Sequence, residues 1–382
     1  MGSRRHAGFE RHGPAMNHAD LLAPQALSHA LALPARFYTE AAMPALDARA
    51  VFAKSWQLVG HETQIANAGD HLVTEIAGLP IVVIRDTAGR IRCYHNVCRH
   101  RAGPLALCDG KGAKALRCKY HGWTYTLDGV LRSAPEMGQT EDFDMASIRL
   151  PELQVGIWHG LVFVGSDGAP PFADFTRGFE TPPQLQGLSP AGYVFHKRFS
   201  YEVACNWKTY CDNYLEGYHV PHIHPALNRL LDYRQYLTDC GDWFSYQTSP
   251  LESDAALYGV GDALYYFIYP NTMLNLLRGR LQANRIVPLG VDRCRVEFDY
   301  YFAADEDDDP GAEARRQADY DFSHLVQHED ITICEHVQRG LASGSYVAGR
   351  LNPLRENAVH HFHELLRAAY RHHPQDRPWE PL

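Results

Sequence analysis

The stretch that decides the fold runs from residue 98 to residue 123 and reads CRHRAGPLALCDGKGAKALRCKYHGW. It holds two pairs of metal-binding residue types, Cys98 with His100 and Cys118 with His121. Two thiolates and two imidazoles suit a structural zinc ion or an iron–sulfur cluster. Zinc fingers normally pair Cys with Cys and His with His, which favours the cluster. The spacing alone leaves both interpretations open.

Short strand-like segments surround this stretch and predict a small all-β domain. They are separated by turn signals such as AGL, TAGR and LDG. The segments read as strands are residues 70–76, 79–86, 90–97, 115–121, 123–127, 130–134 and 156–164. Each Cys/His pair then lies at the tip of a strand–turn–strand unit, so that two loops can face each other.

Residues 110–115, GKGAKA, lie between the two pairs and fit the pattern G-x-G-x-x-A. They follow no predicted βα unit, which a dinucleotide site requires. We interpret them as a turn. The chain is therefore expected to have no flavin or nicotinamide site of its own.

Farther from this stretch, the pattern mixes helical and extended segments. Helical spacing is found at residues 24–57 and 314–342, and strand-like segments at 195–203, 263–270 and 294–303. A linker rich in Gly and Pro is expected at 165–175. The expected division is a leader and helical arm at 1–44, an all-β domain at 45–167 and an α+β domain at 168–382 whose antiparallel sheet has helices to one side.

Composition limits the class of protein. A chain of 382 residues is expected to form two domains. A net charge of -9 and the lack of a dense basic block argue against nucleic-acid binding. No apolar run approaches the roughly 18 residues that a membrane span needs. The polar start reads as a disordered leader, in which Met16 is an alternative first residue, and not as a secretory signal. Nine cysteines, an odd number, fit a reducing compartment, and we expect a cytoplasmic enzyme.

A second group of metal-binding residue types lies at 206–225, NWKTYCDNYLEGYHVPHIHP. A non-haem Fe(II) oxygenase site uses two neutral imidazoles and one carboxylate, and leaves other positions open. His219, His222 and His224 offer three imidazoles. On a continuous helix His219 and His222 share a face, but Pro221 and Pro225 predict a break in the helix. Helical geometry therefore does not choose between the histidines.

The carboxylate must come from elsewhere in the chain. Asp330 has apolar neighbours at helical spacing, and a charged residue in such a stripe needs a partner or a metal. Glu329 has nearly as apolar a neighbourhood, so periodicity leaves both acids open. A position on a solvated helix face or at a helix cap is the alternative for Asp330.

Three motifs together resemble the large (alpha) oxygenase subunit of the Rieske-type non-haem iron oxygenases. They are C-R-H with C-x-Y-H-G-W, then N-W-K with E-G-Y-H-x4-H, then E-D-x4-E-x-V-Q-x-G-L, in that order. In a Rieske [2Fe–2S] centre, two histidines replace two cysteines on one iron. The resemblance implies that Cys98, His100, Cys118 and His121 hold the cluster. It also implies that His219, His224 and Asp330 hold a mononuclear Fe(II).

The resemblance also suggests roles for neighbouring residues. Glu216, where many members have Asp, would accept the N–H of a ligand histidine and link the iron to the cluster of a neighbouring subunit. Asn206, the first residue of its motif, is counted with Glu216 as a candidate catalytic residue. His222 is left as a pocket residue and Asp212 as a cap or ion-pair residue. Lys119 replaces a proline that many members have.

The family has an N-terminal Rieske β domain and a C-terminal catalytic domain of helix-grip shape. Membership implies a homotrimer, because the cluster of one chain serves the iron of its neighbour. It also implies a separate flavin/iron–sulfur reductase that brings electrons from NAD(P)H, with O2 and a small organic molecule as substrates. A small β subunit is not required.

The motifs are closest to the choline-, betaine- and carnitine-type members, which points to hydroxylation or oxidative N-demethylation of a quaternary ammonium or N-methyl compound. Aromatic residues suited to a cation–π cage are Trp243, Phe244, Tyr246, Tyr265, Tyr266, Phe267 and Tyr269. Aromatic residues in strands also commonly form core. On that alternative the substrate is an aromatic acid, clamped by Arg278, Arg280 or Arg285.

A function of another class is a non-catalytic Rieske electron carrier, or a zinc-stabilised scaffold. It needs no second metal and predicts one metal type per chain. The set His219, His224 and Asp330 counts against it.

Overall fold

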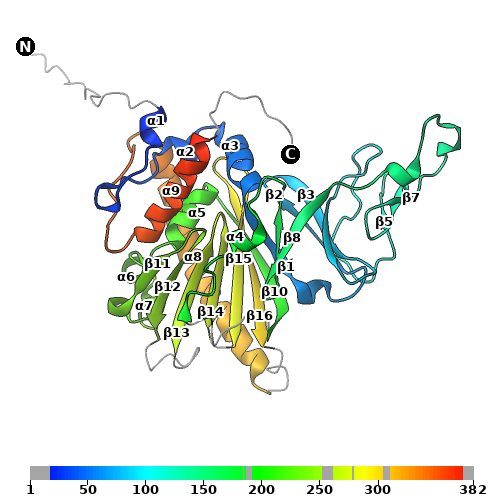
Figure 1. Cartoon of the computed structure of the whole chain (residues 1–382). Coiled ribbons are helices and arrows are strands. Elements are labelled where there is room, and N and C mark those ends of the chain that lie inside the picture. Colours follow the sequence, from blue (N-terminus) through cyan, green and yellow to red (C-terminus); the bar gives the residue numbers. More distant parts are fainter. Residues whose placement is uncertain are drawn as a thin grey trace, which may run out of the picture.

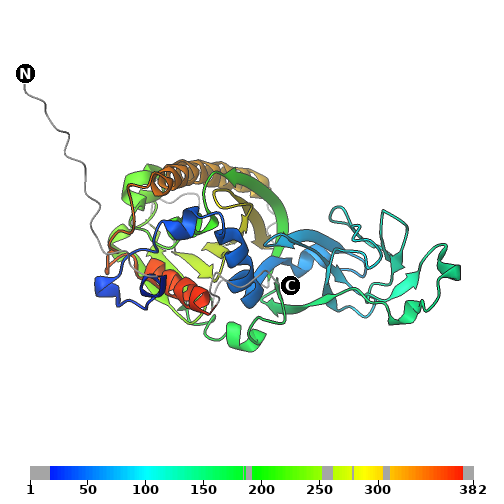
Figure 2. The same cartoon turned by 90° about the horizontal axis from the view of Figure 1, so that it is seen from above.

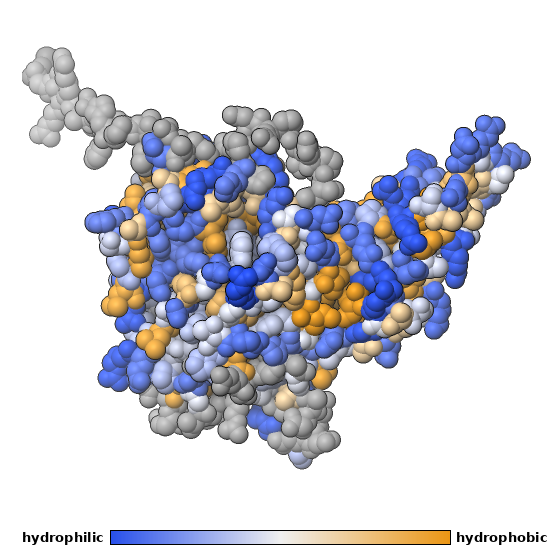
Figure 3. Space-filling view, viewed as in Figure 1, coloured by the Kyte–Doolittle hydropathy of each residue, from blue (hydrophilic) through white to orange (hydrophobic). Residues whose placement is uncertain are grey.

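The computed structural model describes residues 18–183, 185, 192–251, 261–277, 279–303 and 310–372. Figure 1 shows two lobes, a smaller one made of the first strands and a larger one that carries a broad sheet and most helices. In the space-filling view, polar side chains cover much of the visible face, and apolar surface gathers around the waist between the lobes (Figure 3). None of the described helices is long and apolar enough to span a bilayer.

The small lobe contains two antiparallel sheets. The larger one has the strand order β1-β9-β8-β4-β3-β2, and the smaller has the order β5-β6-β7. The strands are β1 Trp56–His61, β2 His71–Ile76, β3 Leu79–Arg85, β4 Ile91–His95, β5 Leu116–Arg117, β6 Thr124–Tyr125, β7 Leu131–Ser133, β8 Glu152–Trp158 and β9 Leu161–Gly165. The small sheet projects away from the large lobe (Figure 1).

Two sequence expectations for this lobe were wrong in detail. Residues 156–164 do not form one strand but a hairpin of β8 and β9, because His159 and Gly160 both take positive φ values, 48° and 80°. The expected helical region 24–57 ends before Trp56, where β1 begins. The side chains of β1 are all buried, as those of a buried helix would be. Apolar content alone therefore did not distinguish a strand from a helix at these residues.

The large lobe is built on an antiparallel sheet with the order β10-β16-β15-β14-β13-β12-β11. Its strands are β10 Tyr193–Val203, β11 Leu237–Cys240, β12 Phe244–Pro250, β13 Asp262–Ile268, β14 Thr272–Leu277, β15 Arg280–Pro288 and β16 Cys294–Ala303. Helix α8, Ala312–Ala342, runs along one face of this curved sheet (Figure 2). Gln282 of β15 donates to Ser323 of α8 at 2.9 Å, which ties the two together. The expected α+β class is confirmed.

Other helices close the remaining sides of the large lobe. They are α1 His18–Leu21, α2 Arg36–Thr39, α3 Met43–Ala50, α4 Phe172–Phe175, α5 Trp207–Tyr214, α6 Val220–Ile223, α7 Pro225–Asn228 and α9 Asn357–Arg371. The buried side chains of α9 repeat at helical spacing, with Val359, Phe362 and Leu366 on one face. That face packs into the same core as the N-terminal arm. The boundaries expected at residues 44/45 and 167/168 stay predictions.

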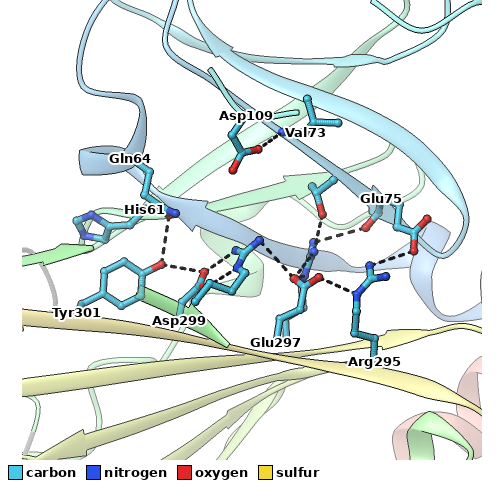
Figure 4. A network of polar contacts seen from close by, with 12 residues as sticks. His61, Gln64, Val73, Glu75, Asp109, Arg295, Glu297, Asp299 and Tyr301 are labelled. Atoms are coloured by element: carbon cyan, nitrogen blue, oxygen red, sulfur yellow. Dashed lines mark hydrogen bonds and ion pairs between the residues drawn. The ribbon is translucent and has the colours of Figure 1, made fainter. Parts of the chain in front are cut away.

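The lobes meet in a network of ion pairs (Figure 4). Glu297 of β16 lies at its centre. Its carboxylate is 2.7 Å from Arg285, 3.0 Å from Arg295 and 3.6 Å from Arg198. Arg295 also pairs with Glu75 of the small lobe at 3.3 Å. The charges of this network, which we call the junction, are satisfied by one another.

A second set of contacts continues the junction. Arg198 pairs with Asp299 at 2.5 Å. Tyr301 donates to Gln64 of the small lobe, and its hydroxyl is 3.3 Å from both Gln64 Oε1 and Asp299 Oδ2. Figure 4 shows these side chains rising from β16 toward the small lobe. These polar contacts join the two lobes, which also share an apolar core.

Candidate active site

Two loops at the outer end of the small lobe bring the first set of site residues together. Cys98 and His100 follow β4, and Cys118 and His121 follow β5. Each loop is a tight turn, in which Cys98 N donates to Gly103 O at 2.9 Å and Cys118 N donates to Trp123 O at 2.8 Å. Both thiols are buried. The two imidazole rings lie 4.6 Å apart between centroids, at 65° to each other.

The surroundings of these four residues fit a cluster. His100 Nδ1 is buried and has no hydrogen-bond partner, so a ligand atom is available. A Cβ atom at Gly103 would lie only 2.9 Å from Cys118 Sγ, so glycine keeps the space beside the sulfur open. Trp123 stacks on His100 with a centroid distance of 4.8 Å and covers one face of this ring. Gly122 has a φ of 74°, which favours glycine at this turn.

Tyr125 is a residue of this site that sequence reasoning missed. Its hydroxyl accepts from Arg99 N at 3.1 Å and lies 3.3 Å from Cys98 Sγ, in position to donate to the sulfur. Burial raises the pKa of the Cys98 thiol, and the Tyr125 contact works in the opposite direction. Hydrogen bonds to cluster sulfurs are one of the factors that set the reduction potential. A tyrosine two residues after Trp123 was the available signal.

The second set comes together in the large lobe. One side-chain donor atom each from His219, His224 and Asp330 lies within 4.8 Å of the other two, and this is the one such group of three in the described part of the chain. His224 Nε2 is 3.0 Å from Asp330 Oδ1, and His219 Nε2 is 3.9 Å from the same oxygen. The expected helix break is real. Helix α6 ends at Ile223 and α7 begins at Pro225, which leaves His224 between them.

Each residue of this set is fixed by a neighbour. Glu216 contacts His219 Nδ1 at 2.7 Å, and Glu329 contacts His224 Nδ1 at 2.7 Å. Both histidines therefore turn Nε2 toward Asp330. Glu329, which the sequence left open as a ligand, is thus a partner of His224. Although burial lowers it, contacts with Asp330 and Glu329 raise the pKa of His224 above its ordinary value. This arrangement of carboxylate, histidine and open Nε2 is that of a metal site.

Comparisons with known proteins agree with this geometry. Residues 55–148 match the Rieske [2Fe-2S] domain, and residues 190–372 match the ring hydroxylating alpha subunit catalytic domain. Choline monooxygenase of Arabidopsis thaliana is 36% identical over 89% of this chain and 83% of its own length. The carnitine monooxygenase oxygenase subunit of Escherichia coli K12 is 30% identical over 89% and 94%.

This chain belongs to the Rieske non-haem iron oxygenases. A solved quaternary ammonium Rieske monooxygenase superposes on it with a TM-score of 0.82 at 26% identity, covering 90% of this chain and 96% of that one. A Rieske oxygenase carries a [2Fe–2S] cluster and a mononuclear iron, and the two side-chain sets described above fit these groups. The enzyme is an oxidoreductase that uses dioxygen.

Not every predicted residue reaches the iron site of the oxygenase. Asn206 caps α5 by accepting from Lys208 N at 3.0 Å, and its amide donates to the backbone oxygens of Tyr38 and Val291. Asn206 does not line the cavity beside His219, His224 and Asp330, so no contact supports its expected catalytic role. His222 is exposed and lines a separate surface hollow with other residues of α6 and α8.

The residues around Asn206 instead tie helices together. Trp207 Nε1 and Lys208 Nζ both donate to Asp47 of α3, at 2.8 and 2.6 Å. Tyr370 of α9 donates to the same carboxylate at 2.6 Å. Asp212 accepts from Tyr38 at 2.6 Å and pairs with His363 at 2.9 Å, in keeping with the ion-pair role expected for it.

A cavity of about 100 Å³ opens beside His219, His224 and Asp330. Its walls come from α5, α7, α8 and strands β13–β16, so the sheet and the long helix enclose it. The aromatic side chains that line it are Tyr210, Tyr214, Tyr236, Tyr265 and Phe298. The amides that line it are Asn213, Asn275, Gln282, Asn284 and Gln327. Lysine and arginine do not occur among the described residues of this lining.

The expected cation–π cage was wrong in most of its members. Of the seven aromatic residues considered, Tyr265 alone lines the cavity. Phe244 and Tyr266 stack on each other in the core, at 5.3 Å and 8°, and Phe267 packs on Phe362 of α9. Neighbouring strand residues point to opposite faces, so a run such as Tyr265-Tyr266 divides between cavity and core.

Among the described residues, the arginine clamp considered for an aromatic acid does not form at the cavity either. Arg280 pairs with Asp319 at 2.9 Å, and Arg285 pairs with Glu297 in the junction. Neither lines the cavity. Arg278 lies outside the residues that the structure describes.

Proposed function

We propose that this oxygenase hydroxylates, or oxidatively N-demethylates, a small quaternary ammonium or N-methyl compound. The observation that carries the proposal is the lining of the cavity. It contains five aromatic side chains and several amides, and its described residues include no lysine or arginine. Aromatic faces attract a cation that has lost its water. The choline and carnitine monooxygenases among the relatives support the same substrate class.

Two rings are well placed to receive the ammonium group. Tyr214 and Tyr265 lie 6.4 Å apart between centroids and 80° to each other, and so form two walls of a corner. Tyr214 is held there because its hydroxyl donates to Asn275 at 2.8 Å. A cation in this corner contacts two ring faces without an ion pair.

The second candidate, an aromatic acid, fits the cavity less well. Its carboxylate needs a cationic partner, and buried carboxylates are expensive without one. The described arginines that we considered are paired with Asp319 and Glu297. The described residues of the lining include the acids Glu216 and Asp330 but no lysine or arginine that would pair with a carboxylate.

Electron transfer is proposed to run between subunits of a homotrimer. Glu216 and His219 line both the active-site cavity and a second, larger cavity of about 670 Å³. The cluster-binding end of the same chain lies on the far side of the molecule (Figure 1). A neighbour's cluster seated at the larger cavity would reach Glu216 directly. A separate NAD(P)H-dependent flavin/iron–sulfur reductase would supply the electrons.

The residues of the chain have defined tasks in this scheme. When bound, the two groups supply electron transfer at the cluster and dioxygen activation at the iron. Glu216 and Glu329 keep the Nδ1 protons on their histidines, so that both Nε2 atoms face the metal. Asn213 donates to Asp330 Oδ1 at 2.7 Å and fixes this carboxylate. The apolar wall of Val220, Leu227, Leu231 and Val326 excludes bulk water.

The first experiment combines metal analysis with substrate screening. About three irons and two sulfides per chain are expected, with a rhombic EPR signal of low average g after reduction. Oxygen uptake with a reductase is then measured for choline, carnitine, glycine betaine and benzoate. Uptake and hydroxylated product with a quaternary ammonium compound are expected. Tight binding of benzoate without binding of any quaternary ammonium compound would reverse the choice of substrate.

The same experiment separates an oxygenase from an electron carrier. A carrier contains two irons and two sulfides per chain and consumes no oxygen with any substrate. A scaffold contains zinc without sulfide. The expected cytoplasmic location stays a prediction, and the Arabidopsis relative is a chloroplastic protein.

A further inference from the structure

Two buried amides of the active-site cavity each have one polar atom without a hydrogen bond. Asn284 of β15 is 2% exposed and its Oδ1 has no partner. Gln327 of α8 is 1% exposed and its Nε2 has no partner. Both residues line the cavity. Such atoms are rare in folded proteins because leaving them unpaired is unfavourable, so each requires an explanation.

The other amides in the same wall are satisfied. Asn275 accepts from Tyr214 at 2.8 Å and donates to Gln282 at 2.7 Å. Gln282 donates to Tyr300 at 2.7 Å and to Ser323 at 2.9 Å. The unpaired atoms of Asn284 and Gln327 are therefore not a general property of this wall.

The contact between Gln282 and Ser323 indicates where the two unsatisfied residues lie. Asn284 is two residues after Gln282, on the same face of β15. Gln327 is four residues after Ser323, on the same face of α8. Strand β15 and helix α8 thus contact each other through Gln282 and Ser323. The next residues on the same two faces, Asn284 and Gln327, line the cavity.

The chemistry of the two open atoms is complementary. Tyr210 donates its hydroxyl proton to Gln327 Oε1, which leaves Nε2 of that amide as a donor. Asn284 Oδ1 is an acceptor. A group that satisfies both must donate one hydrogen bond and accept another. A hydroxyl does this with a single oxygen, whereas a carboxylate only accepts and would face the Asn284 oxygen without a proton.

We infer that Asn284 and Gln327 bind a hydroxyl group of the substrate. The inference rests on the proposed function and narrows it to a quaternary ammonium alcohol, in preference to a zwitterion that carries a carboxylate. The ammonium occupies the aromatic corner and the hydroxyl bridges the two amides. Gln327 lies one helical turn before Asp330, so the hydroxyl end of the substrate is directed toward the metal ligands.

The test is a set of binding constants measured by calorimetry on the holoenzyme. The probes are choline, propyltrimethylammonium, in which a methyl group replaces the hydroxyl, and glycine betaine. Choline is expected to bind at least about tenfold more tightly than either of the others. This comparison needs no variant, so it holds even where a substitution prevents folding.

Variants then assign the preference to the two residues. Asn284→Leu and Gln327→Met are each expected to weaken choline about tenfold and to leave propyltrimethylammonium within about threefold. Gln338→Met is the matched control, since it removes a buried amide of the same helix that is already satisfied and does not line the cavity. It should keep the ratio of the two binding constants.

The outcomes distinguish this inference from the proposed function. Equal binding of choline and propyltrimethylammonium overturns the hydroxyl pair and leaves the quaternary ammonium class standing. Tighter binding of glycine betaine than of choline also overturns the hydroxyl pair and leaves the quaternary ammonium class standing. A ratio that Asn284→Leu and Gln327→Met do not change overturns the residue assignment. Failure of every quaternary cation to bind overturns the proposed function itself.

Discussion

The junction between the lobes and the iron site are both clusters of charged side chains away from bulk water, yet they are built in opposite ways. At the junction, Glu297 is surrounded by three arginines that it satisfies and that satisfy it. At the iron site, Asp330 and two histidines direct donor atoms toward one point. The Nδ1 atoms of the histidines are held by Glu216 and Glu329, and their Nε2 atoms remain for a metal.

The comparison distinguishes a cluster that stabilises the fold from a cluster that can bind a ligand. A cluster whose charges cancel internally has no capacity left for a ligand and fixes the position of the elements that carry it. A cluster whose supporting contacts all lie on the outside keeps its inner atoms open. Substitutions should therefore affect folding at the junction and metal content or turnover at the iron site.

The largest effect is expected from Asp330→Ala. Loss of a direct ligand should release the mononuclear iron and lower product formation at least about a thousandfold, since even supporting residues of metal sites matter tenfold to a hundredfold. Iron should fall by one per chain while sulfide is unchanged. Asp321→Ala removes the same charge from an exposed position of α8 and is the control. Retention of the mononuclear iron in Asp330→Ala would break the comparison.

Glu297→Gln should have the next largest effect, and on stability. Burial opposes ionisation, but Arg285, Arg198 and Arg295 lower the pKa of Glu297 from 4.5 to about 2. This difference corresponds to about 3 kcal/mol of folding free energy. Because the folded pKa is the lower one, the contribution is complete above pH 4.5 and is lost as the pH falls from 4.5 toward 2. Urea unfolding of both proteins measures it.

The stability gap between wild type and Glu297→Gln should accordingly shrink on acidification. Iron and sulfide content at neutral pH should stay unchanged in the variant. If the variant instead loses iron while keeping its unfolding midpoint, the junction is not a purely structural cluster.

Glu216→Gln should lower product formation by about tenfold to a hundredfold. The amide keeps the shape of the side chain but weakens the contact with His219 and removes the negative charge between the two cavities. Both metals should remain bound, and oxidation of the cluster should no longer match product formed. Single-turnover measurements of the two quantities test this. Normal coupling would mean that the electron route is assigned wrongly.

The smallest effect is expected from Glu75→Gln at the rim of the junction. Its ion pair with Arg295 is partly exposed, and such pairs contribute about 0–1 kcal/mol. Arg295 keeps its contact with Glu297 at 3.0 Å in this variant. The same urea measurement at low and high salt should show a small loss that salt removes. A loss as large as that of Glu297→Gln would show that the rim and the centre act as one unit.

The candidate metal ligands were predictable from the sequence because metal chemistry demands particular residue types at short spacing. Cys98 with His100 and the three histidines at 219, 222 and 224 are local patterns of this kind. The choice of His224 over His222 came from resemblance alone, and so did the choice of Asp330 over Glu329. The structure gives a physical reason for it, since Glu329 is engaged by His224 at 2.7 Å. That contact joins residues 105 positions apart, which no local pattern reveals.

The cavity wall was much less predictable. Strand β15 was missed because RLQANRIVP reads as polar, whereas all but its last residue are buried. Asn284 and Gln327 line the same cavity only because of the register of a strand and a helix far apart in sequence. Tyr265 and Tyr266 are adjacent and equally aromatic, and only their alternation across β13 separates a cavity residue from a core residue. Specificity here depends on tertiary register more than on composition.

The cluster-binding loops and the iron site lie on opposite sides of the chain (Figure 1), and this placement has a genetic consequence. Under the proposed route between subunits, a chain without Cys118 keeps a working iron site, and a chain without His219 keeps a working cluster. Each allele alone is null. Expressed together, they form mixed trimers in which one chain's cluster faces the other chain's iron, and activity returns. Two recessive lesions in one gene would thus complement each other, which an electron path confined to a single chain does not allow.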